Sequence, residues 1–292
     1  MQLACGSIIL SNQTPSSPEI STDKSGLQLR VISATVGIPI VLLAVFGGVY
    51  GISALVLMAA VIAGHELALM AKAIHPAQRI RYLVPVVFLV VAGIVRAIDP
   101  GQAFVAVGAL GLAMGVTGVF NAVAIRTGFR RIALPVAIAV LYFGITLAHA
   151  APLADLDSGR QWLLLAILGT FAVDTGAYFT GRAIGRHKLA PVISPKKTWE
   201  GVAGGAIASV TAVVALGAVL DLPLSVLQAC GIGLAVTVSG VLGDLFESWL
   251  KRRAGVKDSG RLLPGHGGIL DRIDSLAPNI AVVYWAIQIV GM

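Results

Sequence analysis

The sequence predicts an all-α, polytopic integral membrane protein with about nine transmembrane helices. Of its 292 residues, 57% are hydrophobic and only 12% are charged, and the mean hydropathy is +0.90. Soluble domains carry about a quarter charged residues. Apolar segments also recur at roughly the 20-residue length that a helix needs to cross a bilayer. An ordinary soluble domain is therefore excluded.

The polar start of the chain differs from everything that follows it. Residues 1–29 are rich in Ser, Thr, Gln and Pro, which is typical of a disordered tail. We expect this tail in the cytoplasm, followed by a single membrane-embedded domain over residues 30–292. Apolar runs in that domain predict helices near 31–48, 50–71, 82–98, 102–125, 132–150, 161–184, 201–220, 223–249 and 276–291. A very short turn is expected between the first two helices.

The positive charges predict the orientation, because cytoplasmic loops of membrane proteins are enriched in Lys and Arg. With the N-terminus in the cytoplasm, all of the 21 Lys and Arg residues except Arg96 and Arg160 lie on the cytoplasmic side. The formal charge of +7 is then explained by topology, so nucleic-acid binding is not expected. Cys5 and Cys230 form neither a disulfide framework nor a metal-type spacing.

Five carboxylic acids lie inside or at the ends of the expected spans, where inserting a charge costs about 2.5–3.5 kcal/mol. They are Glu66, Asp174, Glu200, Asp244 and Glu247. Helical spacing places Asp174 on one helix face with Tyr178 and Arg182. The same spacing rule predicts that one face of a later helix carries Asp244, Glu247, Ser248 and Lys251.

Both of these faces lead into basic loops, at 185–200 and 251–275. The arrangement predicts a polar cavity that faces the cytoplasm. The alternative is that the acids form salt bridges, such as Asp174–Arg182 and Glu247–Lys251, that only hold the bundle together. For one acid the two interpretations are equally good, and for the whole set the cavity is favoured.

The loop at 185–201 carries four Lys and Arg residues. Pro191 and Pro195 prevent it from being helical throughout. Ser194 or Thr198 can cap the next helix and so present free N–H groups to an anion. An ordinary loop that attracts anionic lipid headgroups explains the spacing equally well.

The stretch Ser248–Asp274 holds six basic residues and one histidine among 27 positions. The pair Gly267–Gly268 lets the backbone approach a phosphate closely. His266 lacks a second ligand at metal spacing and suits a phosphate or carboxylate partner better. Hard oxygen ligands that suit Mg²⁺ come from Asp258, Asp271 and Asp274. A solvated basic loop is the alternative, and these carboxylates argue against it.

This stretch resembles the signature of the phosphatidate cytidylyltransferases, also called CDP-diacylglycerol synthases. The matching positions are Ser248, Lys251, Arg252, Lys257, Asp258, Gly260, Leu263, Pro264, His266, Gly267, Gly268, Asp271, Arg272 and Asp274. Two upstream blocks are also similar to the family, at Asp174–Gly201 and Gly243–Ser248. Glu66 resembles an acidic residue in an early helix of the family. The resemblance extends over about residues 60–291.

The resemblance implies transfer of CMP from CTP to phosphatidic acid, with Mg²⁺ and room for a second metal ion. It implies metal ligands at Asp244 and Asp271, with Asp258 and Asp274 as further candidates. The remaining catalytic candidates are Lys251, Lys257, His266 and Arg272. The candidates for substrate binding are Asp174, Tyr178, Arg182, Ser194, Lys196, Lys197, Thr198, Glu200, Ser248, Arg252, Gly267 and Gly268.

The resemblance also places the protein in the plasma membrane, the inner membrane of a bacterium, with the active site facing the cytoplasm. Membrane lipids are then expected partners, and a homodimer is left open. Two other functions compete with this one. A related transferase would use CTP with an ether lipid, a polyprenol or phytol. A transporter would also place acids inside its helices, although the chain has no convincing inverted repeat.

Overall fold

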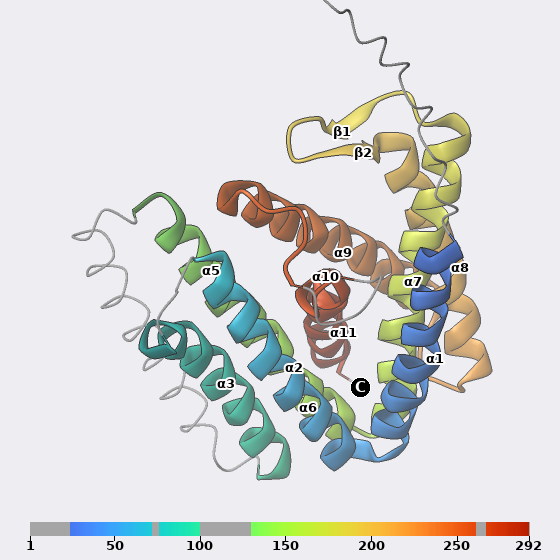
Figure 1. The fold of residues 1–292 in the computed structure, drawn as a ribbon. Helices are drawn as coiled ribbons and strands as arrows, with labels where there is room; N and C mark the ends of the chain where they lie inside the picture. The colour runs from blue at the N-terminus through green and yellow to red at the C-terminus, as the bar shows by residue number, and fades with distance from the viewer. Residues whose placement is uncertain (1–23, 72–75, 100–129, 261–266, 292) are drawn as a thin grey trace, which may run out of the picture.

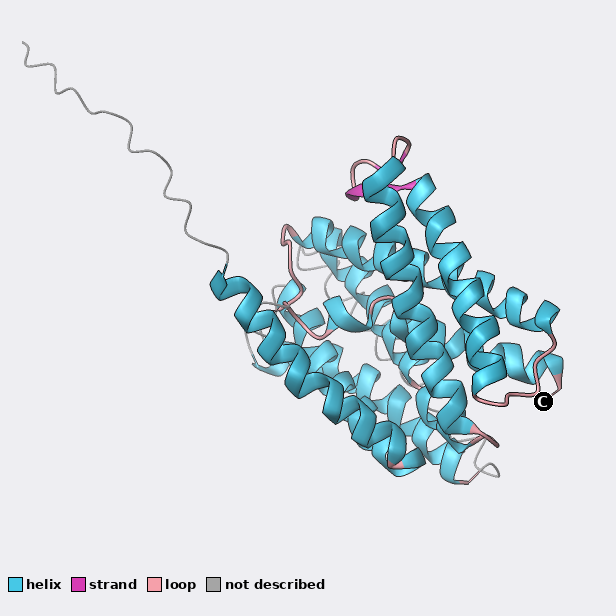
Figure 2. Cartoon of the chain, turned by 90° about the vertical axis from the view of Figure 1, so that its right-hand side faces the viewer, coloured by secondary structure: helices cyan, strands magenta, loops and turns pink. Residues whose placement is uncertain are grey.

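The computed structural model describes residues 24–71, 76–99, 130–260 and 267–291. Figure 1 and Figure 2 show a bundle of helices with one small hairpin of strands at one end. The helices are α1 (Lys24–Phe46), α2 (Gly48–Met70), α3 (Pro76–Ile98), α5 (Arg130–Leu147), α6 (Ala150–Asp155), α7 (Gly159–Ile184), α8 (Trp199–Val219), α9 (Val226–Ala254), α10 (Leu270–Ile273) and α11 (Leu276–Val290). The antiparallel strands are β1 (Lys188–Ala190) and β2 (Ser194–Thr198).

The prediction of an all-α polytopic membrane protein is confirmed. Within the described residues, six helical segments are long and apolar enough to cross a membrane, and two shorter apolar helices accompany them. The count of nine is not confirmed, and the expected helix at 102–125 lies outside the described residues. The short turn between the first two helices is present, because α1 ends at Phe46 and α2 begins at Gly48.

The tail at 1–29 is only partly comparable with the structure. Residues 1–23 lie outside the described residues, and α1 begins at Lys24. The helix thus starts before the apolar run that predicted it. Backbone hydrogen bonding can continue past the end of a hydrophobic segment, so hydropathy marks the span and not the whole helix.

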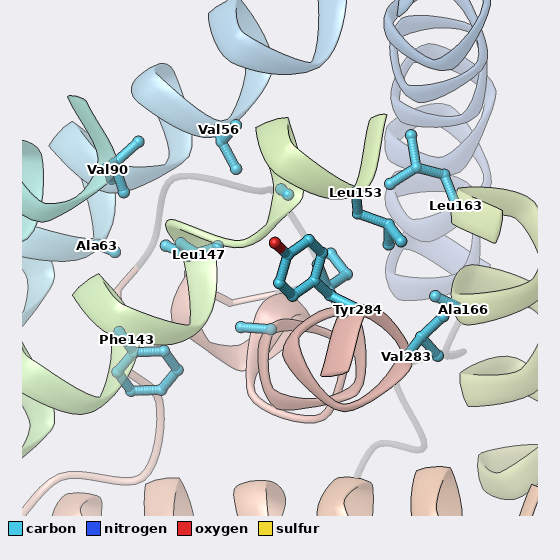
Figure 3. Close-up of a cluster of buried hydrophobic side chains, with 14 of the residues drawn as sticks. Val56, Ala63, Val90, Phe143, Leu147, Leu153, Leu163, Ala166, Val283 and Tyr284 are labelled. Atoms are coloured by element: carbon cyan, nitrogen blue, oxygen red, sulfur yellow. The ribbon is translucent and has the colours of Figure 1, made fainter. Parts of the chain in front are cut away.

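Buried apolar side chains from α2, α3, α5, α6, α7 and α11 meet in one core (Figure 3). Phe143, Leu153 and Leu163 are among its largest fully buried members. In a membrane, lipid tails are as apolar as these side chains, so close packing and polar links hold the helices together.

Three neutral polar residues form such a link at the centre of the bundle. Asn279 on α11 is fully buried and donates from Nδ2 to Thr170 Oγ1 on α7, at 2.8 Å. Ser239 on α9 donates to Asn279 Oδ1. Thr170 in turn donates to the carbonyl of Ala166 in its own helix, at 2.7 Å. The network joins α7 and α9, which carry predicted site residues, to α11, which follows the last of them.

Candidate functional site

Lys251, in the last turns of α9, links Glu247 on its own helix to Asp271 of the signature. Its Nζ lies 2.7 Å from Asp271 Oδ1 on α10 and forms an ion pair with Glu247, one helical turn earlier. The Glu247 side chain is fully buried. A buried charge is tolerated only when it is paired. The Glu247–Lys251 salt bridge, which the sequence suggested as an alternative to a functional role for these residues, is present in the structure.

Asp271 also organises the chain between α9 and α10. Its Oδ2 accepts hydrogen bonds from the backbone N–H groups of Gly268, at 2.8 Å, and Ser259, at 3.1 Å. Gly267 has a φ of +82°, and a Cβ there would lie 2.6 Å from Asp271 Oδ2. Glycine at this position therefore makes room for a carboxylate inside the protein, in addition to any approach to a phosphate.

Asp244, in the middle of α9, connects to the hairpin. Lys197 on β2 places its Nζ 2.6 Å from Asp244 Oδ2, with both side chains only partly exposed. Ser248, one turn later on α9, donates to the other oxygen of Asp244 at 3.2 Å. The two upstream blocks, Asp174–Gly201 and Gly243–Ser248, thus meet through a direct ion pair.

Two further acids lie near enough to Asp244 for their charges to interact. Asp174 on α7 interacts with Asp244, with Lys197 and with Arg272. Asp274, just after α10, interacts with both Asp244 and Asp174. The helices α7, α9 and α10 and the strand β2 therefore contribute to one charged cluster. The sequence predicted that these residues share a site, and the structure brings them together.

The donor set of this cluster suits a hard divalent cation. Asp174, Asp244 and Asp274 repel one another, and Mg²⁺ binds through one or two carboxylates together with substrate phosphates. Among the residues that the structure describes, no three His, Cys, Asp or Glu side chains are placed to hold a metal by themselves. Asp271, a predicted ligand, has both oxygens engaged by Lys251 and backbone N–H groups.

Local contacts explain how the hairpin holds Lys197 in place. Thr198 caps α8, as predicted, because its Oγ1 accepts from Gly201 N at 3.1 Å. Ser194, the other predicted cap, begins β2. Glu200 Oε1 lies 2.6 Å from His187 Nδ1, and both Glu200 oxygens accept from the His187 backbone N–H at 3.2 Å. Glu200 thereby closes the base of the hairpin.

The face of α7 has a different pairing from the predicted salt bridge. Arg182 donates to the Tyr178 hydroxyl at 2.8 Å, and both side chains are exposed. The electrostatic partners of Asp174 instead come from β2, α9 and α10. Arg182 and Asp174 lie two helical turns apart, too far for a direct bridge along one helix.

The remaining candidates differ in how much the structure says about them. Five of them have exposed side chains: Lys196, Arg252, Lys257, Asp258 and Arg272. Arg252 donates to the Val256 carbonyl at 3.4 Å. His266 lies outside the described residues.

Glu66 on α2 is the residue whose role the sequence did not reveal. It is 3% exposed, and it accepts from Ser259 Oγ at 3.0 Å and from the backbone N–H groups of Ile269 and Leu270, both at 2.9 Å. An acid in an apolar span signals a polar partner. The sequence could not identify that partner, because Ser259 is 193 residues away.

Comparison with known proteins gives a consistent set of relatives. A family model described as "Cytidylyltransferase family" matches residues 28–290. The phosphatidate cytidylyltransferase of Staphylococcus haemolyticus (strain JCSC1435) is 46% identical over 136 residues, 47% of this chain and 52% of that protein. The one from Staphylococcus aureus (strain COL) is 50% identical over 119 residues, 41% of this chain and 46% of that protein. The chain therefore aligns with about half the length of these curated relatives.

Proposed function

Because the chain belongs to the cytidylyltransferase family, we propose that it is an enzyme that transfers CMP from CTP to phosphatidic acid. The products are CDP-diacylglycerol, for phospholipid synthesis, and pyrophosphate. The observation that carries the proposal is the charged cluster around the Lys197–Asp244 ion pair. It joins three separate sequence blocks. It also combines carboxylates, which can bind a metal ion, with cationic side chains, which can bind the phosphates of a nucleoside triphosphate.

The reaction needs little covalent chemistry from the protein. The phosphate monoester of phosphatidic acid is largely dianionic near neutral pH, so its oxygen can bond to the α-phosphorus of CTP without a strong base. The bond from that phosphorus to the pyrophosphate oxygen breaks. Catalysis then rests on orientation and on neutralising negative charge.

The chain's own residues divide these tasks. Lys197 and Arg272 lie in the cluster, where they can hold nucleotide phosphates and stabilise the departing pyrophosphate. Lys251 is already bound to two acids, so we assign it first to holding α9 and α10 together. When bound, Mg²⁺ supplies charge neutralisation at the triphosphate. Its proposed ligands are Asp244 and Asp271, with Asp258 and Asp274 as further candidates.

The direct test is turnover by the purified protein. CTP and phosphatidic acid should give CDP-diacylglycerol and pyrophosphate, and removal of divalent cations should abolish the reaction, because phosphates and aspartates repel at close range. A lipid kinase would instead release CDP and phosphorylate a prenol acceptor. Solute flux in proteoliposomes without CTP would favour a transporter. Either result, with no pyrophosphate formed from phosphatidic acid, would reject the proposal.

We also propose that the protein lies in the plasma membrane with the charged cluster facing the cytoplasm, where CTP is available. Asp157 and Arg186 flank the two ends of α7 and are both exposed. After replacement of Cys5 and Cys230, a cysteine at 186 should react with an impermeant thiol reagent only in opened membranes. A cysteine at 157 should react in intact cells whose outer envelope is permeable. Labelling of the cysteine at position 186 from outside intact cells would show that the protein has the opposite orientation in the membrane.

A further inference from the structure

Glu66 joins the first half of the chain to the signature turn, a name used here for the described residues 259–260 and 267–270 only. It lies on α2, and its carboxyl group receives three hydrogen bonds from that turn. Oε1 accepts from Ile269 N at 2.9 Å. Oε2 accepts from Leu270 N at 2.9 Å and from Ser259 Oγ at 3.0 Å. One side chain thus satisfies donors at both ends of the turn.

The fit around Glu66 is close. A Cβ on Gly268 would lie 2.6 Å from both oxygens of Glu66, a separation that real Cβ atoms do not tolerate. Gly268 is buried, and its own N–H donates to Asp271 rather than to Glu66. The base of the turn is therefore held from two sides, by Asp271 within the signature and by Glu66 from a distant helix.

The position of these bonds determines what they control. Leu270 is the first residue of α10, and Ile269 is its N-cap. Asp271 and Arg272 follow on α10, and Asp274 comes directly after it. Fixing the backbone N–H groups at the start of α10 therefore fixes where these charged side chains lie relative to α9.

We infer that Glu66 is a positioning residue for the reaction, acting through the backbone of the signature turn to hold α10 against α9. The inference rests on the proposed function for its kinetic consequence. Groups that orient the ligands of a site from one layer further out typically change activity by about 10–100-fold when removed. Glu66 was not among the site residues that the sequence predicted. Its three hydrogen bonds to the signature turn are the evidence for this positioning role.

The test substitutes Glu66→Gln, which keeps the size of the side chain and replaces one acceptor oxygen with an N–H donor. The amide must then face either Ile269 N–H or the Ser259 and Leu270 donors, which all donate already. We expect hydrogen exchange at the Ile269 and Leu270 amides to speed up by about 10-fold or more. We expect kcat to fall by about 10-fold or more, with the KM for CTP within about 3-fold.

Thr237→Val is the matched control. Thr237 is also buried, lies on α9, and donates only within its own helix, to Gly233 O at 2.9 Å. Its loss should lower thermal stability without changing exchange at Ile269 and Leu270 and without the fall in kcat. An equal fall in kcat in both variants, at equal loss of stability, would show that Glu66 acts only through general stability and would overturn the inference.

Amide exchange requires no turnover, so it separates this inference from the proposed function. If the unmodified protein does not convert CTP and phosphatidic acid, the proposed function fails, and the positioning role for its reaction fails with it, whatever exchange reports about the contact. If turnover occurs and the exchange rates in Glu66→Gln are unchanged, the inference alone fails. Should Glu66→Gln not fold, Ser259→Ala carries the test. It removes one bond to Glu66 and should lower kcat by about 3-fold or more at unchanged KM, and an unchanged kcat would overturn the inference.

Discussion

Two polar regions inside the bundle are built in opposite ways. At the centre, Asn279, Thr170 and Ser239 are neutral, and they bond to one another across α11, α7 and α9. At the end of the bundle that carries the hairpin, the cluster around Asp244 consists of charged groups. The Asn279 side chain is 0% exposed, whereas the side chains of Lys197 and Asp244 are 23% and 32% exposed.

The difference shows which polar groups in this protein serve the fold and which are available for a ligand. The central residues satisfy one another, so nothing from outside is needed to complete them. The cluster keeps several carboxylates near each other and partly open, which is unfavourable unless a cation or a ligand compensates them. Polar groups in a membrane protein are expensive, so an open charged cluster implies a function that requires it.

Removal of a carboxylate from the charged cluster should have the largest effect. Asp244→Asn and Asp271→Asn should each lower kcat by at least about 100-fold, because each would remove a negative charge proposed to hold the Mg²⁺ that neutralises the substrate phosphates. Turnover of CTP with phosphatidic acid at saturating Mg²⁺ measures this, with a thermal melt to confirm folding. Near-normal turnover in both variants would refute the metal assignment.

Substitutions of Lys197, in the charged cluster, and of Lys251, which bridges Glu247 and Asp271, should separate effects on substrate binding from effects on folding. Lys197→Ala should raise the KM for CTP or lower kcat by about 10- to 100-fold, because a charge-assisted bond of about 1.5–3 kcal/mol is lost. Lys251→Ala should reduce activity as well, and it should also destabilise the protein by about 3–5 kcal/mol, because it leaves buried Glu247 unpaired.

Arg253→Ala is the control for both lysine variants. Arg253 is exposed on the same helix and lies over the Trp249 ring, 5.5 Å from its centroid. It should leave the kinetics unchanged. Equal kinetic effects of the Arg253 and Lys197 substitutions would mean that activity depends on the total positive charge of this surface. The argument for a localised site would then be lost.

Much of the fold was predictable because hydropathy is a local property. The predicted helices at 161–184 and 201–220 agree closely with Gly159–Ile184 and Trp199–Val219. α9 instead continues to Ala254, beyond the predicted 249, because basic residues are favourable in the last turn of a helix. The strands β1 and β2 were not predicted, since they are short and polar and their pairing depends on the turn between them.

The site was predictable where chemistry and spacing coincide in one segment. Lys251, Asp244 and Asp271 were identified in this way. The structure pairs Lys251 with Asp271 and pairs Asp244 with Lys197. The role of Glu66 was not predictable, because it depends on a contact between α2 and a turn near the other end of the chain. Long-range contacts of this kind leave no periodic signal in the sequence.

The smallest effect on activity should come from the neutral network. Asn279→Leu removes both its bond to Thr170 and its acceptor for Ser239. Interhelical hydrogen bonds in membranes contribute about 0.6 kcal/mol on average and about 1.7 at most, so unfolding should become easier by about 1–2 kcal/mol. kcat and the KM for CTP, measured per folded molecule, should stay within about 2-fold of normal. Reversible unfolding in mixed micelles and steady-state kinetics measure the two quantities. A large loss of kcat with little loss of stability would mean that the centre of the bundle, like its charged end, takes part in positioning Asp174 and Asp244, and the contrast between the two regions would no longer hold.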